Sequence, residues 1–201
     1  MAIAERELST PTHNRLYTEE EYLALEEAAE EKSEYIDGEI RPMSGGTYYH
    51  SFIAAKLITA LNVALDETEC DASSADTKVH AAGNMFYPDV SVVCGAPVYH
   101  GRSRVVITNP ILVAEVLSPS TGRTDRGEKM RDYLQIETLE VYLLVTQSEP
   151  RLEMVSRQAD GSWKTETVTG LDATLAIPAL SISLKLADVY RRVVFEAAEE
   201  L

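Results

Sequence analysis

Apolar residues recur along this chain at two kinds of spacing, one typical of helices and one typical of strands. Helical spacing is clearest over residues 49–65, where an apolar stripe predicts a core helix. A shorter helix is predicted after residues 18–21, because Thr18 and Glu21 have the spacing of a capping box. Similar spacing predicts a helix over residues 124–136 and a closing helix over residues 186–195.

The strand-like segments are shorter. Asp37-Gly38 separates two apolar segments and predicts a tight hairpin turn near the N-terminus. Residues 111–117 are almost continuously apolar, as in a strand that is covered on both faces in the middle of a sheet. Residues 141–146 predict a second buried strand.

Four further segments complete the predicted sheet. Residues 70–80 alternate weakly and are interpreted as a strand, and Gly83-Asn84 is interpreted as a turn. Residues 89–93 predict a short strand that follows Pro88. Residues 151–157 and 162–168 predict a C-terminal antiparallel hairpin around Asp160-Gly161.

The order of these elements predicts an α/β (α+β) fold, with a mixed β-sheet flanked by helices. Residues 1–16 show no clear periodicity and are interpreted as a flexible N-terminal arm. Residues 17–201 are expected to form a single domain, because domains commonly contain about 100–200 residues.

Two acidic residues fall within the predicted strands. Asp89 opens one strand and Glu115 lies inside another, where an ionised carboxylate without a partner is costly to bury. Neighbouring strands are about 4.8 Å apart, so both carboxylates can bind one cation if they face the same side. Mg²⁺ or Mn²⁺ suits such oxygen ligands. The alternative is that Asp89 only begins a strand and that Glu115 pairs with Arg or Lys.

Lys129 lies on the predicted helix that follows the Glu115 strand, one turn before Tyr133. A lysine returned to the sheet there can neutralise a scissile phosphate and orient or deprotonate an attacking water. The alternative is a surface lysine paired with Asp125.

Other candidate residues carry weaker signals. Glu34 is a further candidate metal ligand in the N-terminal hairpin, with a solvated acid as the alternative. His50 begins the second helix and can contact a substrate phosphate, or it can simply cap or pack. Ser118 and Arg123 bound a polar loop suited to an anion, although such a loop can equally be a plain turn. Tyr133 is included among the candidate substrate-binding residues.

The net charge of −15 argues against a generic nucleic-acid binder, because phosphate binding normally draws on an excess of Lys and Arg. The charge is unevenly distributed, however. Residues 17–39 contain ten acids and one base, whereas residues 101–131 contain six bases and three acids. The central stretch is therefore compatible with a polyanionic substrate.

Several classes of protein are disfavoured. No membrane span or secretory signal is recognised, so a cytoplasmic location is expected. Cys70 and Cys94 are isolated, with no CxxC motif or Cys/His cluster beside either, and both are expected to be reduced. GxxxxGK[ST], HExxH and GxSxG are absent from the sequence, so nucleotide-loop, zincin and serine-hydrolase functions have little support.

Taken in order, Tyr87-Pro88-Asp89, Ala114-Glu115-Val116-Leu117-Ser118-Pro119-Ser120-Thr121 and Lys129 to Tyr133 resemble a restriction-endonuclease-like family of bacterial proteins within the PD-(D/E)xK nuclease superfamily. The resemblance extends over most of the chain. It implies a mixed four- or five-stranded core sheet and Mg²⁺-dependent hydrolysis of DNA phosphodiester bonds. By the same resemblance, Asp89 and Glu115 are metal ligands and Lys129 is the catalytic lysine.

One position departs from the superfamily pattern. The usual lysine follows the acid by two residues, where this chain has Leu117, whereas the related family carries its lysine on the next helix. A nuclease-fold binding or regulatory protein without activity is therefore one alternative, and a metal-dependent hydrolase of a small phosphorylated molecule is another. By analogy with enzymes that cut both DNA strands, a homodimer is expected.

Overall fold

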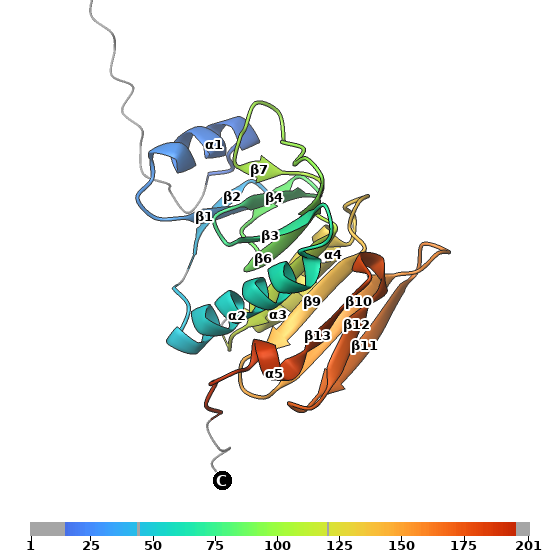
Figure 1. The fold of residues 1–201 in the computed structure, drawn as a ribbon. Helices are drawn as coiled ribbons and strands as arrows, with labels where there is room; N and C mark the ends of the chain where they lie inside the picture. The colour runs from blue at the N-terminus through green and yellow to red at the C-terminus, as the bar shows by residue number, and fades with distance from the viewer. Residues whose placement is uncertain (1–14, 44, 120, 196–201) are drawn as a thin grey trace, which may run out of the picture.

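The computed structural model describes residues 15–43, 45–119 and 121–195 (Figure 1). The predicted N-terminal arm therefore lies outside the described residues, except for Arg15 and Leu16. The helical segments are α1 (Glu19–Ala28), α2 (Tyr48–Leu65), α3 (Gly122–Thr124), the π-helical segment η1 (Asp125–Lys129), α4 (Met130–Tyr133), the 3-10 segment η2 (Pro178–Leu180) and α5 (Leu186–Val189).

The strands lie between these helical segments, several of them in succession. They are β1 (Ser33–Ile36), β2 (Glu39–Pro42), β3 (Cys70–Ser74), β4 (Lys78–Ala81), β5 (Asn84–Phe86), β6 (Val90–Cys94), β7 (Val106–Ile107), β8 (Leu112–Leu117), β9 (Val141–Thr146), β10 (Arg151–Arg157), β11 (Trp163–Thr169), β12 (Thr174–Ile177) and β13 (Ile182–Lys185).

Three sheets are formed by these strands. A six-stranded sheet has the order β11-β10-β9-β8-β6-β3, a five-stranded sheet has the order β2-β1-β5-β4-β7, and β12 pairs with β13. In the six-stranded sheet β8 is parallel to β9 and antiparallel to β6. The mixed α+β fold is thus confirmed, although the strands are divided among sheets and the largest sheet exceeds the four or five strands implied by the resemblance.

The two faces of the six-stranded sheet are covered differently. On one face, Ala114 and Val116 belong to the same core cluster as Leu57 and Leu61 of α2, and Figure 1 shows α2 lying across this sheet. On the other face, Val113 packs in a cluster that includes side chains from β4, β5 and α4. Because side chains alternate along a strand, Glu115 faces the same side as Val113, toward the five-stranded sheet.

The N-terminal elements match the predictions closely. The capping box of α1 is present, with the Thr18 side chain accepting from the Glu21 backbone N–H. Asp37 and Gly38 adopt φ values of 52° and 84°, as a two-residue turn between β1 and β2 requires. The next turn falls one residue earlier than predicted, because Ala82 and Gly83 have positive φ values and Asn84 already belongs to β5.

Other boundaries differ from the predictions. The predicted strand over residues 70–80 is divided into β3 and β4 by a turn. The predicted helix over residues 124–136 begins at Gly122 and ends at Tyr133. In the turns that follow it, the Arg157 guanidinium donates to the carbonyl oxygens of Ile136 and Leu139. These hydrogen bonds satisfy carbonyl groups outside the helix.

The closing helix predicted over residues 186–195 ends at Val189. The Tyr190 hydroxyl lies 2.8 Å from the Thr146 carbonyl oxygen and 2.7 Å from that of Arg151, which fixes the chain against the six-stranded sheet. Arg192 then adopts a φ of 69°, which is incompatible with a continued right-handed helix. Strands β12 and β13 were not predicted from the sequence.

The expectation that Cys70 and Cys94 are reduced is wrong in this structure, where the two sulfur atoms form a disulfide. Cys70 and Cys94 are directly opposite each other in the antiparallel pair of β3 and β6. Their separation of 24 residues along the chain concealed this cross-strand pairing.

Among the residues that the structure describes, even the longest and most apolar helix does not meet the requirements for crossing a bilayer.

Candidate active site

Asp89 and Glu115 are brought together by the pairing of β6 with β8. Asp89 directly precedes β6, and its neighbour Val90 lies opposite Ala114, the residue before Glu115. The Asp89 backbone N–H donates to Glu115 Oε2 over 3.4 Å. In return, Asp89 Oδ2 accepts from the Val116 backbone N–H at 2.7 Å. The two acids therefore support each other through the backbone of adjacent strands.

Glu115 is buried in this arrangement, with only 4% of its surface exposed. Burial raises the pKa of its carboxyl group well above the ordinary value, and the nearby Asp89 carboxylate adds to this effect. The Lys129 ammonium acts in the opposite direction. A cation bound beside Glu115 would likewise favour the ionised carboxylate.

Lys129 lies beneath the protein surface among three carboxylates. Its Nζ is 2.8 Å from Glu34 Oε1, 3.6 Å from Glu115 Oε1 and 3.8 Å from Asp125 Oδ1. Burial lowers the lysine pKa, but the three carboxylates outweigh burial and keep the pKa above its ordinary value. Lys129 is consequently a protonated hydrogen-bond donor at neutral pH.

The π-helical segment η1 begins at Asp125 and ends at Lys129. Both of these residues are buried, whereas Arg126, Gly127 and Glu128 between them are exposed. Single π-helical turns inside α-helices are frequent at functional sites, because the wider turn redirects side chains. Here the segment directs an acid and a lysine toward Glu115.

Glu34 approaches the same group from the five-stranded sheet. It lies in β1, is 8% exposed, and accepts a 3.1 Å hydrogen bond from the Tyr87 backbone N–H. The same atom, Oε1, contacts Lys129. Glu34 therefore supplies the nearest counter-ion of the lysine, at the place where the two large sheets meet.

His50 lies in the first turn of α2, which is capped by the Thr47 side chain. Its Nε2 is 3.2 Å from Asp89 Oδ2, and both side chains retain some exposure, 17% for His50 and 16% for Asp89. The hydrogen bond to Asp89 raises the histidine pKa, although burial opposes the shift. Asp89 is thus the acid of the pair that solvent can reach.

The other predicted binding residues occupy different environments. Ser118 is half-buried and its Oγ lies 2.9 Å from Thr121 Oγ1, whereas Arg123 is exposed at the start of the helical segment. Tyr133 is fully buried and donates its hydroxyl to Glu115 Oε1 over 3.3 Å. In this conformation Tyr133 contacts a candidate ligand and presents no surface to a substrate.

The donor set suits a hard divalent cation. Four carboxylates (Glu34, Asp89, Glu115 and Asp125) face one lysine and one histidine, and Asp125 Oδ1 is buried without a hydrogen-bond partner. Mg²⁺ commonly takes one or two protein carboxylates and completes its coordination with water and substrate phosphate. Asp89 and Glu115 supply two such carboxylates from adjacent strands. Glu34 is the less suitable ligand, because its Oε1 already contacts the Lys129 ammonium.

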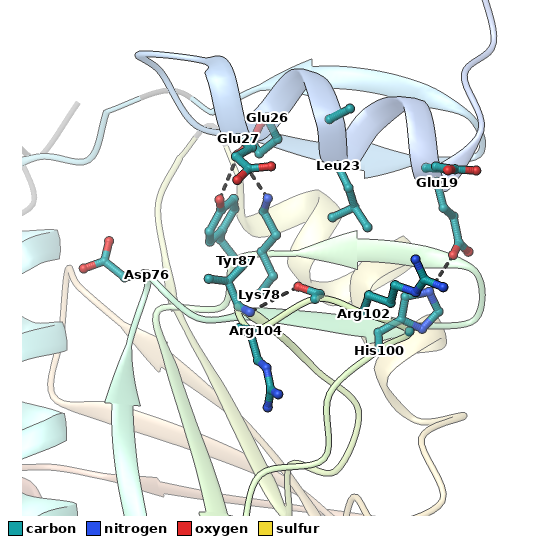
Figure 2. Close-up of a pocket in the computed structure, with 15 residues that line it drawn as sticks. Glu19, Leu23, Glu26, Glu27, Asp76, Lys78, Tyr87, His100, Arg102 and Arg104 are labelled. Carbon is teal, nitrogen blue, oxygen red and sulfur yellow. Dashed lines mark hydrogen bonds and ion pairs between the residues drawn. The ribbon is translucent and has the colours of Figure 1, made fainter.

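A large cavity lies elsewhere. It has a volume of about 1080 Å³ and opens between α1 and residues 100–105. Figure 2 shows Glu19, Lys78, Tyr87 and His100 among its lining residues. Asp89, Glu115 and Lys129 do not line this cavity.

Sequence reasoning gave too little weight to two features. Asp125 was considered only as a surface partner of Lys129, yet it is 2% exposed. Asn84 donates from Nδ2 to Asp132 over 2.7 Å, and its Oδ1 accepts from the Asp37 N–H, which ties α4 to the N-terminal hairpin. The spacing of Asp125 and Lys129 signalled the first feature, whereas the second depends on contacts between distant segments.

Two proteins of known sequence are similar to this chain over most of its length. The chain is 37% identical over 178 residues to the uncharacterized protein slr1290 of Synechocystis sp., a match covering 88% of this chain and 92% of that protein. It is 33% identical over 170 residues to the uncharacterized protein sll1609 of the same organism, which covers 84% of this chain and 96% of that protein.

A solved structure has the same fold. It is the crystal structure described as a putative nuclease belonging to DUF820 from Anabaena variabilis, with a TM-score of 0.73 and 20% sequence identity. The match covers 88% of this chain and 99% of that one. Residues 19–188 match the family model Uma2, described as "Putative restriction endonuclease". This protein therefore belongs to the Uma2 family.

Proposed function

We propose that this protein is a divalent-metal-dependent endonuclease that hydrolyses DNA phosphodiester bonds, with Mg²⁺ or Mn²⁺ held by Asp89 and Glu115. One observation carries the proposal: the Lys129 ammonium lies 3.6 Å from Glu115 Oε1, and the other carboxylate oxygen, Oε2, accepts a hydrogen bond from the Asp89 backbone N–H. Two acids can hold a metal ion and a lysine can stabilise negative charge on a phosphate, which together suit phosphodiester hydrolysis. Membership of the Uma2 family supports the same reaction class.

The bound ion would polarise the scissile phosphate and favour the hydroxide form of water. The neighbouring carboxylates raise the pKa of Lys129, and in this proposal the protonated lysine donates hydrogen bonds and stabilises the negative charge of the phosphate. Glu34 holds the lysine in position from the other sheet, which makes Glu34 a positioning residue in this proposal. Tyr133 positions Glu115 in the same way.

DNA is the proposed substrate, and His50, Ser118 and Arg123 are the proposed contacts outside the metal pair. His50 is a polar group beside Asp89, and Arg123 supplies an exposed cation after the strand that carries Glu115. DNA phosphates can accept hydrogen bonds from both kinds of side chain. A homodimer acting in the cytoplasm remains part of the prediction.

Cleavage of supercoiled plasmid DNA by the purified full-length protein tests the proposal. Wild type is expected to nick or linearise the plasmid with Mg²⁺ or Mn²⁺ and to be inactive in EDTA. Asp89→Asn and Glu115→Gln should abolish this activity, whereas Asp188→Asn, which removes an exposed acid from α5, should retain it. Equal cleavage by wild type and both site variants would contradict the assignment.

A second function is favoured by Leu117, which occupies the position of the usual superfamily lysine on the same face of β8 as Glu115. On that account the protein binds partners without cutting DNA. Calorimetry with Mn²⁺ separates the two accounts, because the inactive module predicts weak metal binding and no turnover. Binding to duplex DNA that depends strongly on salt would disfavour a small phosphorylated substrate.

A further inference from the structure

A group of possible metal ligands lies at the opposite side of the five-stranded sheet from the Lys129 cluster, where α1 packs. Glu19, His80 and His100 each present a ligand atom, and these atoms all lie within 4.8 Å of one another. Glu19 begins α1, His80 lies in β4, and His100 precedes β7. Within the described parts of the chain, this is the group of three or more His, Cys, Asp or Glu residues that meets this distance.

The three side chains form one cluster, in which both imidazole rings contact the Glu19 carboxylate. Glu19 Oε1 is 3.2 Å from His80 Nε2, and Glu19 Oε2 is 2.7 Å from His100 Nε2. The two imidazole rings are stacked, with centroids 4.0 Å apart and planes inclined by 13°. Both ring nitrogens therefore point to the two oxygens of the same carboxylate.

We propose that Glu19, His80 and His100 form a site for Zn²⁺ or a similar first-row transition ion. Two imidazole nitrogens and one carboxylate oxygen are a common zinc donor set that leaves a fourth position for water. Ligands about 2.0–2.2 Å from a tetrahedral ion are separated from one another by about 3.3–3.5 Å. The 3.2 Å contact of Glu19 with His80 is near this range, whereas the 2.7 Å contact with His100 would lengthen when an ion binds. Mg²⁺ prefers oxygen ligands, so this site differs in chemistry from Asp89 and Glu115.

The surroundings give an ion access to this site. The side chains of His80, His100 and Glu19 are 22%, 28% and 34% exposed. Glu19 and His100 also line the cavity of about 1080 Å³, as Figure 2 shows. An ion can enter from the cavity, and the fourth ligand can be water or a group bound in it.

The site joins three segments that are distant in sequence. An ion there would fix the first turn of α1 and the segment before β7 to β4. Binding to the folded chain alone would also raise its thermal stability. The inference does not depend on the proposed nuclease activity.

Metal titration of the full-length protein tests the site. The protein is stripped with EDTA, dialysed, and carries Asp89→Asn and Glu115→Gln so that the candidate active site does not contribute. Calorimetry with Zn²⁺ and the visible absorption spectrum with Co²⁺ are then recorded. We expect saturable binding of a single ion per chain, a Co²⁺ spectrum of nitrogen and oxygen ligation, and a higher Tm with Zn²⁺.

Ligand variants in the same background make the test specific. Glu19→Gln and His100→Gln should weaken Zn²⁺ binding by at least about 10- to 100-fold, the loss that removal of even an outer-shell partner causes. Glu20→Gln is the matched control, because it removes an exposed charge from the same helical turn and should leave the affinity unchanged. Absence of saturable binding, or equal affinity in Glu19→Gln, His100→Gln and Glu20→Gln, would overturn the proposal.

Discussion

The ammonium of Lys129 lies 2.8 Å from Glu34 Oε1. Lys129 belongs to the helical segment after β8 of the six-stranded sheet, so a carboxylate from the five-stranded sheet holds it in place. The usual superfamily position on β8 is taken by Leu117, yet the Lys129 ammonium lies 3.6 Å from Glu115. The lysine reaches Glu115 from η1, and the second sheet fixes its position.

Lys129→Met should destabilise the metal-free protein by about 3–5 kcal/mol, because it leaves buried carboxylates without their cation. Mn²⁺ should restore part of this loss by replacing the missing positive charge. Urea unfolding with EDTA and with Mn²⁺ measures both effects. Lys164→Met, at an exposed position on β11, is the control and should change the free energy of unfolding by less than about 0.5 kcal/mol. Equal destabilisation with and without Mn²⁺ would argue against metal binding near Lys129.

Tyr133→Phe should weaken Mn²⁺ binding about 10-fold, because the tyrosine hydroxyl donates to Glu115 Oε1. Tyr142→Phe provides the comparison, since that hydroxyl donates its hydrogen bond to the Asp125 backbone carbonyl oxygen and not to a proposed ligand carboxylate. Both variants should lose about 1 kcal/mol of stability, but only Tyr133→Phe should lose metal affinity. Calorimetry measures the Mn²⁺ affinity of both variants, and equal affinities would contradict a role for Tyr133 in positioning Glu115.

His50 should make the stability of the metal-free protein depend on pH. Its hydrogen bond to Asp89 raises its pKa above the ordinary 6.5, so the protonated form stabilises the fold. This contribution is fully present below pH 6.5 and is lost as pH rises through the raised pKa. The stability difference between wild type and His50→Gln should therefore be constant below pH 6.5 and shrink as the pH rises through the raised histidine pKa.

NMR titration of the His50 ring checks the same contact directly. Asp89→Asn should lower the histidine pKa, and Mg²⁺ should lower it in the wild type by competing for the Asp89 carboxylate. A histidine pKa that neither change affects would contradict the assigned contact.

Arg123→Ala should weaken binding of duplex DNA and reduce the slope of log affinity against log salt by about 1. The expected cause is loss of one phosphate contact from an exposed cation near the candidate site. Fluorescence anisotropy over a range of salt concentrations measures the slope, with catalysis blocked by EDTA. Arg191→Ala changes the charge equally at an exposed position after α5 and should leave the slope unchanged. If Arg123→Ala and Arg191→Ala reduced the slope equally, binding would depend only on overall charge, and the proposed phosphate contact of Arg123 would be contradicted.

The sequence predicted much of the fold because its strongest signals are local. Asp37-Gly38 specifies a hairpin by its turn conformation, and the apolar run around Glu115 specifies a strand buried on both faces. The closing helix was predicted too long, because the end at Val189 depends on hydrogen bonds of Tyr190 with residues far along the chain. The Cys70–Cys94 bond likewise depends on strand register, which the weak alternation of residues 70–80 did not specify.

Part of the candidate site could also be predicted from the sequence. Asp89, Glu115 and Lys129 were identified from strand context and resemblance, and the structure brings all three together. The role of Glu34 as the lysine's partner was not predicted, because it depends on the packing of one sheet against another. The Glu19, His80 and His100 group was missed for the same reason, since its members are dispersed along the sequence.

The account depends most on the claim that Asp89 and Glu115 hold one ion. A crystal structure of the full-length protein soaked with Mn²⁺ tests this claim, because the anomalous signal locates the metal independently of the protein atoms. The account predicts a peak coordinated by carboxylate oxygens of both Asp89 and Glu115, which is lost in Asp89→Asn. Absence of a peak between these residues, or Mn²⁺ found solely at Glu19, His80 and His100, would contradict it.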